Sequence, residues 1–209
     1  NEASYAVAEH ISGTTDWSGF ADIMNERAKE LGCVDSHFVN PNGLPDENHY
    51  TSSYDLARIG MAFFKNDLLC KISSTSRLDL EPTEKQPKHV IENSKNQLFP
   101  GKTYAYEYLV GSKTGYTVAA KSTLVSCAEK DGLKLIAVVM VEDSPAQFAD
   151  TVSLFQYGFE NFEKVNISQK ETRYQMENGN AFYGGSDIFG SSQPILSINT
   201  RDTIILPKT

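Results

Sequence analysis

The sequence predicts an α+β fold in which amphipathic helices accompany an antiparallel sheet. Two observations lead to this prediction. Four segments have the apolar spacing or the Ala-rich composition of helices, and two β-rich runs, 121–129 and 133–142, flank Asp131-Gly132. Because Asp-Gly between such runs is a strong signal for a tight hairpin, the two runs should form neighbouring antiparallel strands.

The first two predicted helices occupy the beginning of the chain. The Ala-rich segment 2–11 should form a helix that ends at Gly13, because glycine readily adopts the left-handed conformation found at helix ends. Asp16 can cap the second helix, and Gly32 supplies its stop. The apolar stripe of the second helix comprises Phe20, Ile23, Met24 and Leu31.

A loop, a third helix and an irregular segment follow. The stretch 38–46 (FVNPNGLPD) contains so many turn-forming residues that we expect an ordered loop. Thr51, Ser52 or Ser53 can then cap a helix. The apolar positions that recur at helical spacing in it are Leu56, Ile59, Phe63 and Phe64. Between residues 71 and 97 the pattern is polar and irregular, which indicates short strands and loops.

The second half of the chain supplies the sheet and a last long helix. The run KLIAVVMV within 133–142 is apolar on both faces of a strand, so this strand should be covered on both sides. Pro145 can open a helix that continues to about residue 162. One side of this helix carries Phe148, Val152, Phe155 and Phe159.

The chain changes character after the long helix. Short alternating runs follow, with Gly184-Gly185 and a final SINTRDTIILP, and they indicate the start of a β-rich domain. We therefore predict that residues 1–163 belong to one domain and that residues 164–209 begin a second.

Composition and charge narrow the range of partners. Of the 209 residues, 40% are hydrophobic and 22% charged, as in ordinary globular proteins. Lys and Arg total 19 against 27 Asp and Glu, which gives a formal net charge of −8. An acidic chain without a basic run repels phosphate backbones, so we expect no nucleic-acid partner. No apolar run reaches membrane-spanning length, so we expect no membrane anchor within these residues, and one is possible only beyond Thr209.

Two sets of residues could suggest disulfides or a metal site. The first comprises Cys33, Cys70 and Cys127, and the second comprises Asp35, His37, Asp46 and His49. The cysteines are widely spaced and odd in number, so we interpret them as buried small apolar residues. The acidic residues and histidines lack the tight spacing of metal ligands, and we interpret them as polar loop residues. We therefore expect neither a metal nor a cofactor.

The stretch GSKTGYT, residues 111–117, contains the best candidates for functional side chains in this sequence. It follows an aromatic run of Tyr104, Tyr106 and Tyr108, which we expect to pack in a core or line a cleft rather than form a carbohydrate platform. Within it, the Lys113 ammonium beside the Thr114 hydroxyl suits a carboxylate, and Gly115 would let a ligand backbone approach the strand. If the strand lies at an edge, it can also bind an extended peptide.

K-T-G alone occurs by chance in many proteins, but with S-x-x-K and S-D-N it marks class A β-lactamases and penicillin-binding proteins. Further segments extend the pattern, in the order NEASYAVAEHISG, MNERAKELGCVDSHFVNPNGLPDENHYTSSYDLARI, VGSKTGYT and KDGLKLIAVVM. Together they resemble the D-alanyl-D-alanine carboxypeptidases, the low-molecular-mass penicillin-binding proteins of peptidase family S11. The similarity runs from Asn1 to about Phe162, and the remainder resembles the start of their β-rich C-terminal domain. It implies the penicillin-recognising, β-lactamase/transpeptidase-like fold: an antiparallel sheet flanked by helices.

The resemblance also implies acyl transfer by an activated serine. In this family the nucleophile belongs to S-x-x-K, in which the lysine can take the hydroxyl proton. No serine of this chain has a lysine three residues later, and only Asn1 matches the second motif, S-x-N. The resemblance therefore implies that the chain is the C-terminal part of the enzyme, inactive alone, and that the N-terminal segment is one of its partners.

The resemblance assigns roles to five positions. Lys113 would stabilise the charges that develop during acylation, and Thr114 would bond the terminal carboxylate of the substrate. Gly115 would leave space for the substrate backbone. The backbone N–H of Tyr116 would be one oxyanion-hole donor, and Asn1 would bond the penultimate amide of the substrate and help orient the upstream lysine.

One position departs from the family pattern. An Arg usually precedes the helix that ends in YGFxNF and contributes to the carboxylate site, whereas this chain has Gln147 there. An amide supplies no charge, so carboxylate affinity should be lower. A surface residue without a role is the alternative interpretation. The polar stretch 93–96 resembles one that the family carries near its active site, and we assign no role to it.

Three functions are compatible with these residues. The first is a serine-type D-Ala-D-Ala carboxypeptidase, located outside the cytoplasm of a bacterium, that acts on peptidoglycan stem peptides and is inhibited by β-lactam antibiotics. The second is a β-lactamase, which the FVNPNGLPD loop and the β-rich tail disfavour. The third is a non-catalytic cell-wall-binding or scaffolding protein of the same fold, which the absent serine and Gln147 leave open.

Overall fold

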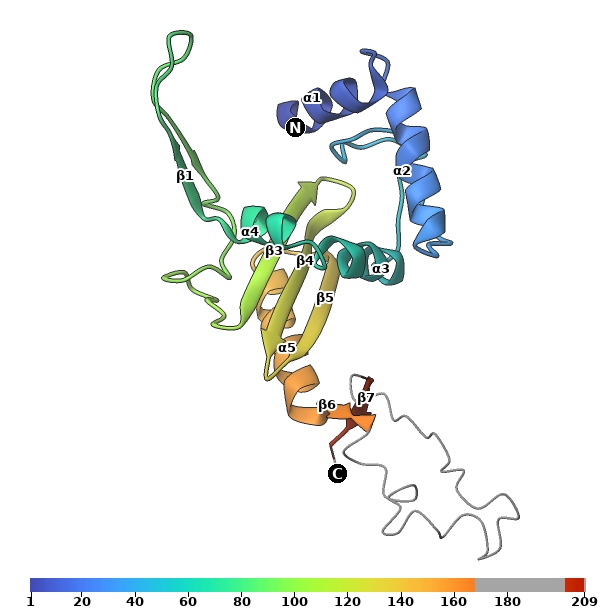
Figure 1. Cartoon of the computed structure of the whole chain (residues 1–209), viewed down its shortest axis with the longest axis vertical. Coiled ribbons are helices and arrows are strands. Elements are labelled where there is room, and N and C mark those ends of the chain that lie inside the picture. Colours follow the sequence, from blue (N-terminus) through green and yellow to red (C-terminus); the bar gives the residue numbers. More distant parts are fainter. Residues whose placement is uncertain (168–201, 209) are drawn as a thin grey trace, which may run out of the picture. The chain divides into compact units, whose positions relative to one another are not determined.

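The computed structural model describes residues 1–167 and 202–208 (Figure 1). The chain divides into two compact units, Asn1–Gly158 and Phe159–Thr209. The first unit combines helices with a three-stranded antiparallel sheet and a separate two-stranded hairpin. This mixture of helices and antiparallel strands confirms the predicted α+β class.

The described residues form five helices. They are α1 (Glu2–Ser12), α2 (Ser18–Glu30), α3 (Ser53–Phe63), α4 (Asp67–Ser74) and α5 (Ala146–Asn161). Four of them confirm the predicted helical segments. Gly13 ends α1 with a φ of 71°, as expected of a glycine stop. Ser52 caps α3, because its hydroxyl accepts a hydrogen bond from the amide of Asp55 at 3.2 Å.

Two predictions about helices are wrong. Helix α4 was not predicted, and its last residues, 71–74, overlap the segment 71–97 that we expected to form short strands and loops. The rest of that segment contains two short strands, as expected. Asn66 begins it by accepting hydrogen bonds from two amides of the first turn. With only eight residues, α4 is too short for a clear periodic pattern. The cap of α2 is Trp17 rather than Asp16, whose carboxylate instead accepts a hydrogen bond from the Ser18 amide at 3.1 Å.

The central sheet consists of three strands in the order β3 (Leu109–Thr117), β4 (Lys121–Lys130) and β5 (Leu133–Glu142). Both strand pairs are antiparallel. Asp131 and Gly132 join β4 to β5 with φ angles of 51° and 76°. A two-residue turn that matches the twist of its strands requires positive φ at both positions, so the predicted hairpin is confirmed.

Helices cover both faces of the sheet. A Cβ atom added to Gly60 of α3 would lie 3.2 Å from Ile136, and one added to Gly158 of α5 would lie 2.4 Å from Leu135. Because successive strand residues point to opposite faces, α3 lies against one face of β5 and α5 against the other (Figure 1). The prediction that the run 133–142 is covered on both sides is therefore confirmed.

A third close approach, at Gly111 of β3, leads to a testable prediction. A Cβ atom there would lie 2.1 Å from Ser73 Oγ of α4 and 3.1 Å from Phe64. Gly111→Ala should therefore lower the free energy of unfolding, measured in urea, by about 1–3 kcal/mol. Gly19 of α2 has no atom within 4 Å of its added Cβ, so Gly19→Ala should raise stability by about 0.5–1 kcal/mol. Equal effects of the two substitutions would contradict this packing.

Apolar and aromatic side chains fill the space between the sheet and α5. The central cluster consists of Leu98, Leu124 and Phe148. Tyr104 stacks on Phe148 with 6.0 Å between ring centroids, and Tyr106 stacks on Phe155 at 5.3 Å. These contacts confirm that the tyrosines before β3 pack against other side chains.

The cysteines are free thiols. Cys33 and Cys127 are buried, as predicted, and Cys70 is half-buried. Burial raises the pKa of Cys127 to about 12, so this thiol stays protonated at neutral pH.

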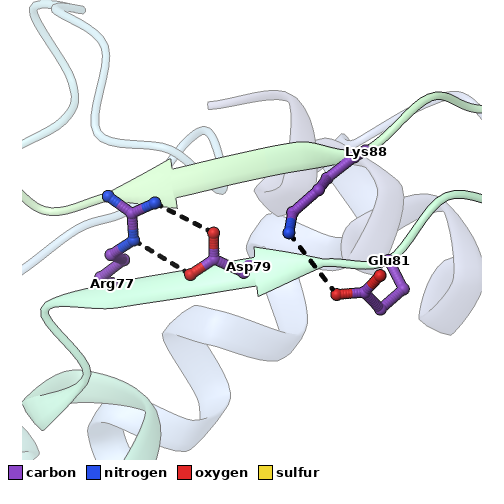
Figure 2. A network of polar contacts seen from close by, with 4 residues as sticks. All are labelled: Arg77, Asp79, Glu81 and Lys88. Atoms are coloured by element: carbon purple, nitrogen blue, oxygen red, sulfur yellow. Dashed lines mark hydrogen bonds and ion pairs between the residues drawn. The ribbon is translucent and has the colours of Figure 1, made fainter.

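The segment between α4 and the sheet includes a separate hairpin of β1 (Arg77–Leu80) and β2 (His89–Glu92). Figure 2 shows the ion pairs along it, with Arg77 3.0 Å from Asp79 and Lys88 3.7 Å from Glu81. Every residue of both strands is exposed. Exposed ion pairs contribute little to stability. The backbone hydrogen bonds between β1 and β2 therefore stabilise this hairpin more than its ion pairs do.

In the second unit, β6 (Phe162–Asn166) pairs antiparallel with β7 (Thr203–Pro207). The Gly184-Gly185 pair lies outside the described residues. Among residues 1–167 and 202–208, no helix has the length and hydropathy needed to cross a membrane.

Candidate active site

The K-T-G residues lie on a strand at one edge of the described sheet. All of the stretch 111–117 belongs to β3, and within residues 1–167 and 202–208 the only strand that pairs with β3 is β4. The other edge of β3 is therefore open in the described structure. Such an edge can add an extended peptide as a further strand.

Strand alternation assigns the site residues to two faces. The Cβ direction of Gly111 leads to Ser73 of α4, and Lys113 lies two residues further on, so its side chain leaves β3 on the same face. Thr114 pairs with Leu124, which packs against α5 on the opposite face. The half-buried side chain of Thr114 therefore leaves β3 on the face opposite to that of Lys113.

Lys113 is an exposed residue whose ammonium is partly desolvated. Desolvation by the surrounding protein lowers the pKa of Lys113. Its Nζ donates a hydrogen bond to the carbonyl oxygen of Thr114. The charge therefore lies beside the backbone of the strand edge, where it can act on a ligand that binds along that edge.

Gly115 is required by the neighbouring strand. A Cβ atom at this position would lie 2.5 Å from Oγ1 of Thr123, its partner on β4. On the face that carries Lys113, the Thr123 hydroxyl thus occupies the space that a side chain at Gly115 would need. The next residue, Tyr116, is 72% exposed.

Asn1 is exposed at the cap position of α1 and makes no side-chain cap bond. Its carbonyl oxygen accepts hydrogen bonds from the amides of Ser4 and Tyr5 at 3.0 and 3.2 Å. Its role toward a substrate, like those of the β3 residues, stays a prediction.

Gln147 is buried, so the interpretation of it as a surface residue is wrong, and its role in a carboxylate site stays a prediction. It lies in the first turn of α5 and is only 5% exposed. Its Nε2 donates a hydrogen bond to Ser144 Oγ at 3.5 Å, while its buried Oε1 has no hydrogen-bond partner among the described residues. Because α5 packs on the face that carries Thr114, Gln147 belongs to that side of the sheet.

The histidines and acidic residues of the loop before α3 support its backbone. His49 Nδ1 accepts a hydrogen bond from the amide of Val39 at 3.2 Å, and Asp46 accepts one from the amide of Asn48 at 2.8 Å. Among residues 1–167 and 202–208, no group of three or more His, Cys, Asp or Glu side chains could hold a metal ion.

Sequence reasoning missed two buried polar residues. Asn96 is completely buried and donates a hydrogen bond to Ser112, directly before Lys113. Asp55 is also completely buried, under the loop before α3. The signal for Asn96 was a polar residue two positions before the apolar pair Leu98-Phe99. For Asp55 it was the place of this residue in the first turn after the cap Ser52.

Solved structures define the class of this fold. DacD from Francisella tularensis, described as a D-alanyl-D-alanine carboxypeptidase, matches with a TM-score of 0.68 and 25% identity, over 79% of this chain and 50% of that one. Penicillin binding protein 6B from Escherichia coli matches with a TM-score of 0.70 and 26% identity, over 100% and 54%. The chain therefore has the penicillin-recognising fold that the resemblance implied.

Sequence comparison identifies the family. The family model described as D-alanyl-D-alanine carboxypeptidase matches residues 1–144, and the chain belongs to this family. DacF of Bacillus subtilis (strain 168) is 36% identical over 165 residues, which cover 78% of this chain and 40% of DacF. DacA of Haemophilus influenzae is 32% identical over 186 residues, with 88% and 44% covered. The chain thus spans less than half the length of these two relatives.

Proposed function

We propose that this chain is part of a serine-type D-Ala-D-Ala carboxypeptidase that removes the terminal D-alanine from peptidoglycan stem peptides and is inhibited covalently by penicillin. The observation that carries the proposal is the open edge of β3 with the Lys113 ammonium beside it. Family membership supports it, because the matching relatives are described as D-alanyl-D-alanine carboxypeptidases.

In the proposed reaction, a serine hydroxyl attacks the carbonyl carbon between the two D-alanines. The bond to the terminal D-alanine nitrogen breaks, the serine proton ends on that leaving amine, and water then hydrolyses the acyl-serine ester. The serine comes from outside these 209 residues, because no S-x-x-K occurs in them.

The residues of β3 bind the free end of the substrate. Lys113 stabilises negative charge that develops during attack, and the Tyr116 amide donates to the oxyanion. Thr114 bonds the terminal carboxylate around the strand edge, and the backbone at Gly115 lies alongside the substrate. Asn1 orients the penultimate amide of the substrate and the upstream lysine.

Gln147 takes the place of a cation in this scheme. Its neutral amide, buried on the Thr114 side of the sheet, makes the carboxylate site weaker than one with an arginine. For the same reason, a non-catalytic wall-binding protein of the same fold remains the second candidate.

Two wider proposals follow from family membership. The enzyme works outside the cytoplasm, at the cell wall, because its substrate is peptidoglycan. Residues 1–163 form part of the catalytic domain, and residues 164–209 begin a β-rich domain, of which β6 and β7 are the described strands.

Labelling with a fluorescent penicillin tests the proposed function. The isolated 209-residue chain should take no covalent label, because its sequence lacks the S-x-x-K serine. The full-length protein should be labelled on a serine outside this chain, as peptide mass spectrometry would show. Label on a serine of residues 1–209 would contradict the placement of the nucleophile, and an unlabelled full-length protein would favour the wall-binding candidate.

A further inference from the structure

Asn96 connects the loop before β3 to the strand itself. Its Nδ2 donates a hydrogen bond to Ser112 Oγ at 2.5 Å, and its Oδ1 accepts one from the amide of Leu98 at 3.0 Å. Asn96 and Ser112 are 0% and 1% exposed. Both ends of the amide are therefore bonded away from water, where the loss of a partner costs most.

The loop that follows Asn96, residues 97–106, is held by buried side chains and by its own backbone hydrogen bonds. Leu98 and Phe99 are buried at 0% and 2% exposure. The amides of Tyr104 and Tyr106 donate hydrogen bonds to the carbonyl oxygens of Gln97 and Leu98 at 3.1 and 3.0 Å. Asn96 thus attaches Ser112 to a buried loop that is closed by its own backbone bonds.

Ser112 lies directly after an irregular part of β3, where a hydrogen bond from outside the strand can fix the backbone. The register of β3 against β4 shifts between Leu109 and Gly111, just before Ser112. An irregularity of this kind bends a strand locally, and β3 has a described neighbour on one side only. Lys113 follows Ser112 directly, so a movement of Ser112 redirects the Lys113 side chain.

We propose that Asn96 is a positioning residue for Lys113: its bond to Ser112 fixes the start of the open β3 edge, and with it the direction of the ammonium. This inference rests on the proposed function of Lys113 in acylation. Asn96 itself touches neither substrate nor serine in this scheme.

The sheet contains a matched control for the Asn96–Ser112 bond. Ser126 pairs with Ser112 across β3 and β4 and is 0% exposed, yet its Oγ has no hydrogen-bond partner among the described residues. Ser112→Ala and Ser126→Ala remove the same atom from neighbouring buried sites. Only the first of them breaks the bond to Asn96.

The test uses the full-length protein and two separate measurements. The first is the rate of acylation at saturating penicillin, and the second is the affinity of the noncovalent penicillin complex that forms before acylation. Asn96→Ala and Ser112→Ala should each lower that rate by about 10- to 100-fold, with a smaller change in affinity. The double variant should lose no more than the larger single loss, because both substitutions remove one bond. Ser126→Ala and Ser94→Ala, the latter at an exposed position of the same loop, should leave the rate unchanged.

Amide hydrogen exchange supplies a readout that does not depend on activity. In Asn96→Ala and Ser112→Ala, the amides of Lys113, Thr114 and Gly115 should exchange faster than in the wild type, whereas Ser126→Ala should change none of them. Equal effects of Ser112→Ala and Ser126→Ala on rate and exchange would overturn the proposal. If the wild type takes no label, the proposed function fails, and the exchange pattern still decides whether Asn96 positions β3.

Discussion

Replacing Lys113 by alanine in the full-length protein should lower the rate of acylation by penicillin by about 100- to 1,000-fold, the usual effect of removing a group that stabilises transition-state charge. The ammonium lies beside the open edge of β3, bonded to the Thr114 carbonyl. Lys113 is exposed, but the surrounding protein partly desolvates its ammonium, and a partly desolvated charge acts on a nearby ligand more strongly than a charge in bulk water.

A second lysine provides the control. Lys95 is exposed on the loop before β3, so Lys95→Ala removes the same charge without touching the strand edge. It should leave the acylation rate unchanged. Equal losses in Lys113→Ala and Lys95→Ala would show that net charge, rather than the position of Lys113, governs the reaction.

The pH dependence of acylation follows from the environment of Lys113. Desolvation lowers its pKa, so the ammonium loses its proton at a lower pH than an ordinary lysine does. Acylation should therefore decline on the alkaline side before ordinary lysines titrate. A rate that stays constant until the ordinary lysine range, near pH 10.4, would contradict a role for the desolvated charge.

Replacing Asp55 by alanine should lower the melting temperature by roughly 5–10 °C. The Oδ2 atom of this buried carboxylate accepts hydrogen bonds from the amides of Val34 and Asp35 at 3.1 and 2.7 Å and from the hydroxyl of Ser36 at 2.7 Å. Alanine would leave these donors without an acceptor. The loop after α2 would then lose its attachment to the start of α3.

Asp67 is the matched control for Asp55, since each lies in the first turn of a helix. Asp67 is exposed, so Asp67→Ala removes the favourable charge at a helix start without affecting a buried loop. Calorimetry should give a change of no more than about 2–4 °C for it. Similar melting temperatures for the two variants would mean that the buried bonds of Asp55 contribute nothing.

Acid should remove this contribution only at low pH. Burial raises the pKa of Asp55, but the hydrogen bonds from Ser36, Asp35 and Val34 and the charge of Arg58 outweigh it, so the pKa lies below its ordinary value of 3.8. A carboxylate with a lowered folded-state pKa stabilises the fold fully above its unfolded pKa and loses that effect as the pH falls through the folded pKa. The difference between wild type and Asp55→Ala should thus persist from neutral pH to about pH 4 and shrink below it.

Strong local signals made much of the fold predictable. Asp131-Gly132 fixes the β4–β5 hairpin because few residue pairs accept positive φ twice, and Pro145 with its phenylalanine stripe fixes α5. Helix α4 was missed because its eight residues are too few for a period and because Asn66, its cap, lies in polar surroundings. Short elements of this kind depend on packing, here against β3, more than on local sequence.

The candidate site was predictable as a motif but not as a geometry. K-T-G and the flanking segments indicated the reaction class and the residues of β3. The sequence could not show that the Thr123 hydroxyl occupies the space beside Gly115, nor that Gln147 is buried. Both facts, like the bond between Asn96 and Ser112, arise between elements distant in sequence, where periodicity carries no information.

The most direct measurement is amide hydrogen exchange on the full-length protein with and without bound penicillin. If the free end of a peptide or a penicillin lies along β3, amides on the open edge between Lys113 and Tyr116 should become protected in the complex. Protection elsewhere, with exchange in this part of β3 unchanged, would contradict the proposal that this edge binds the substrate.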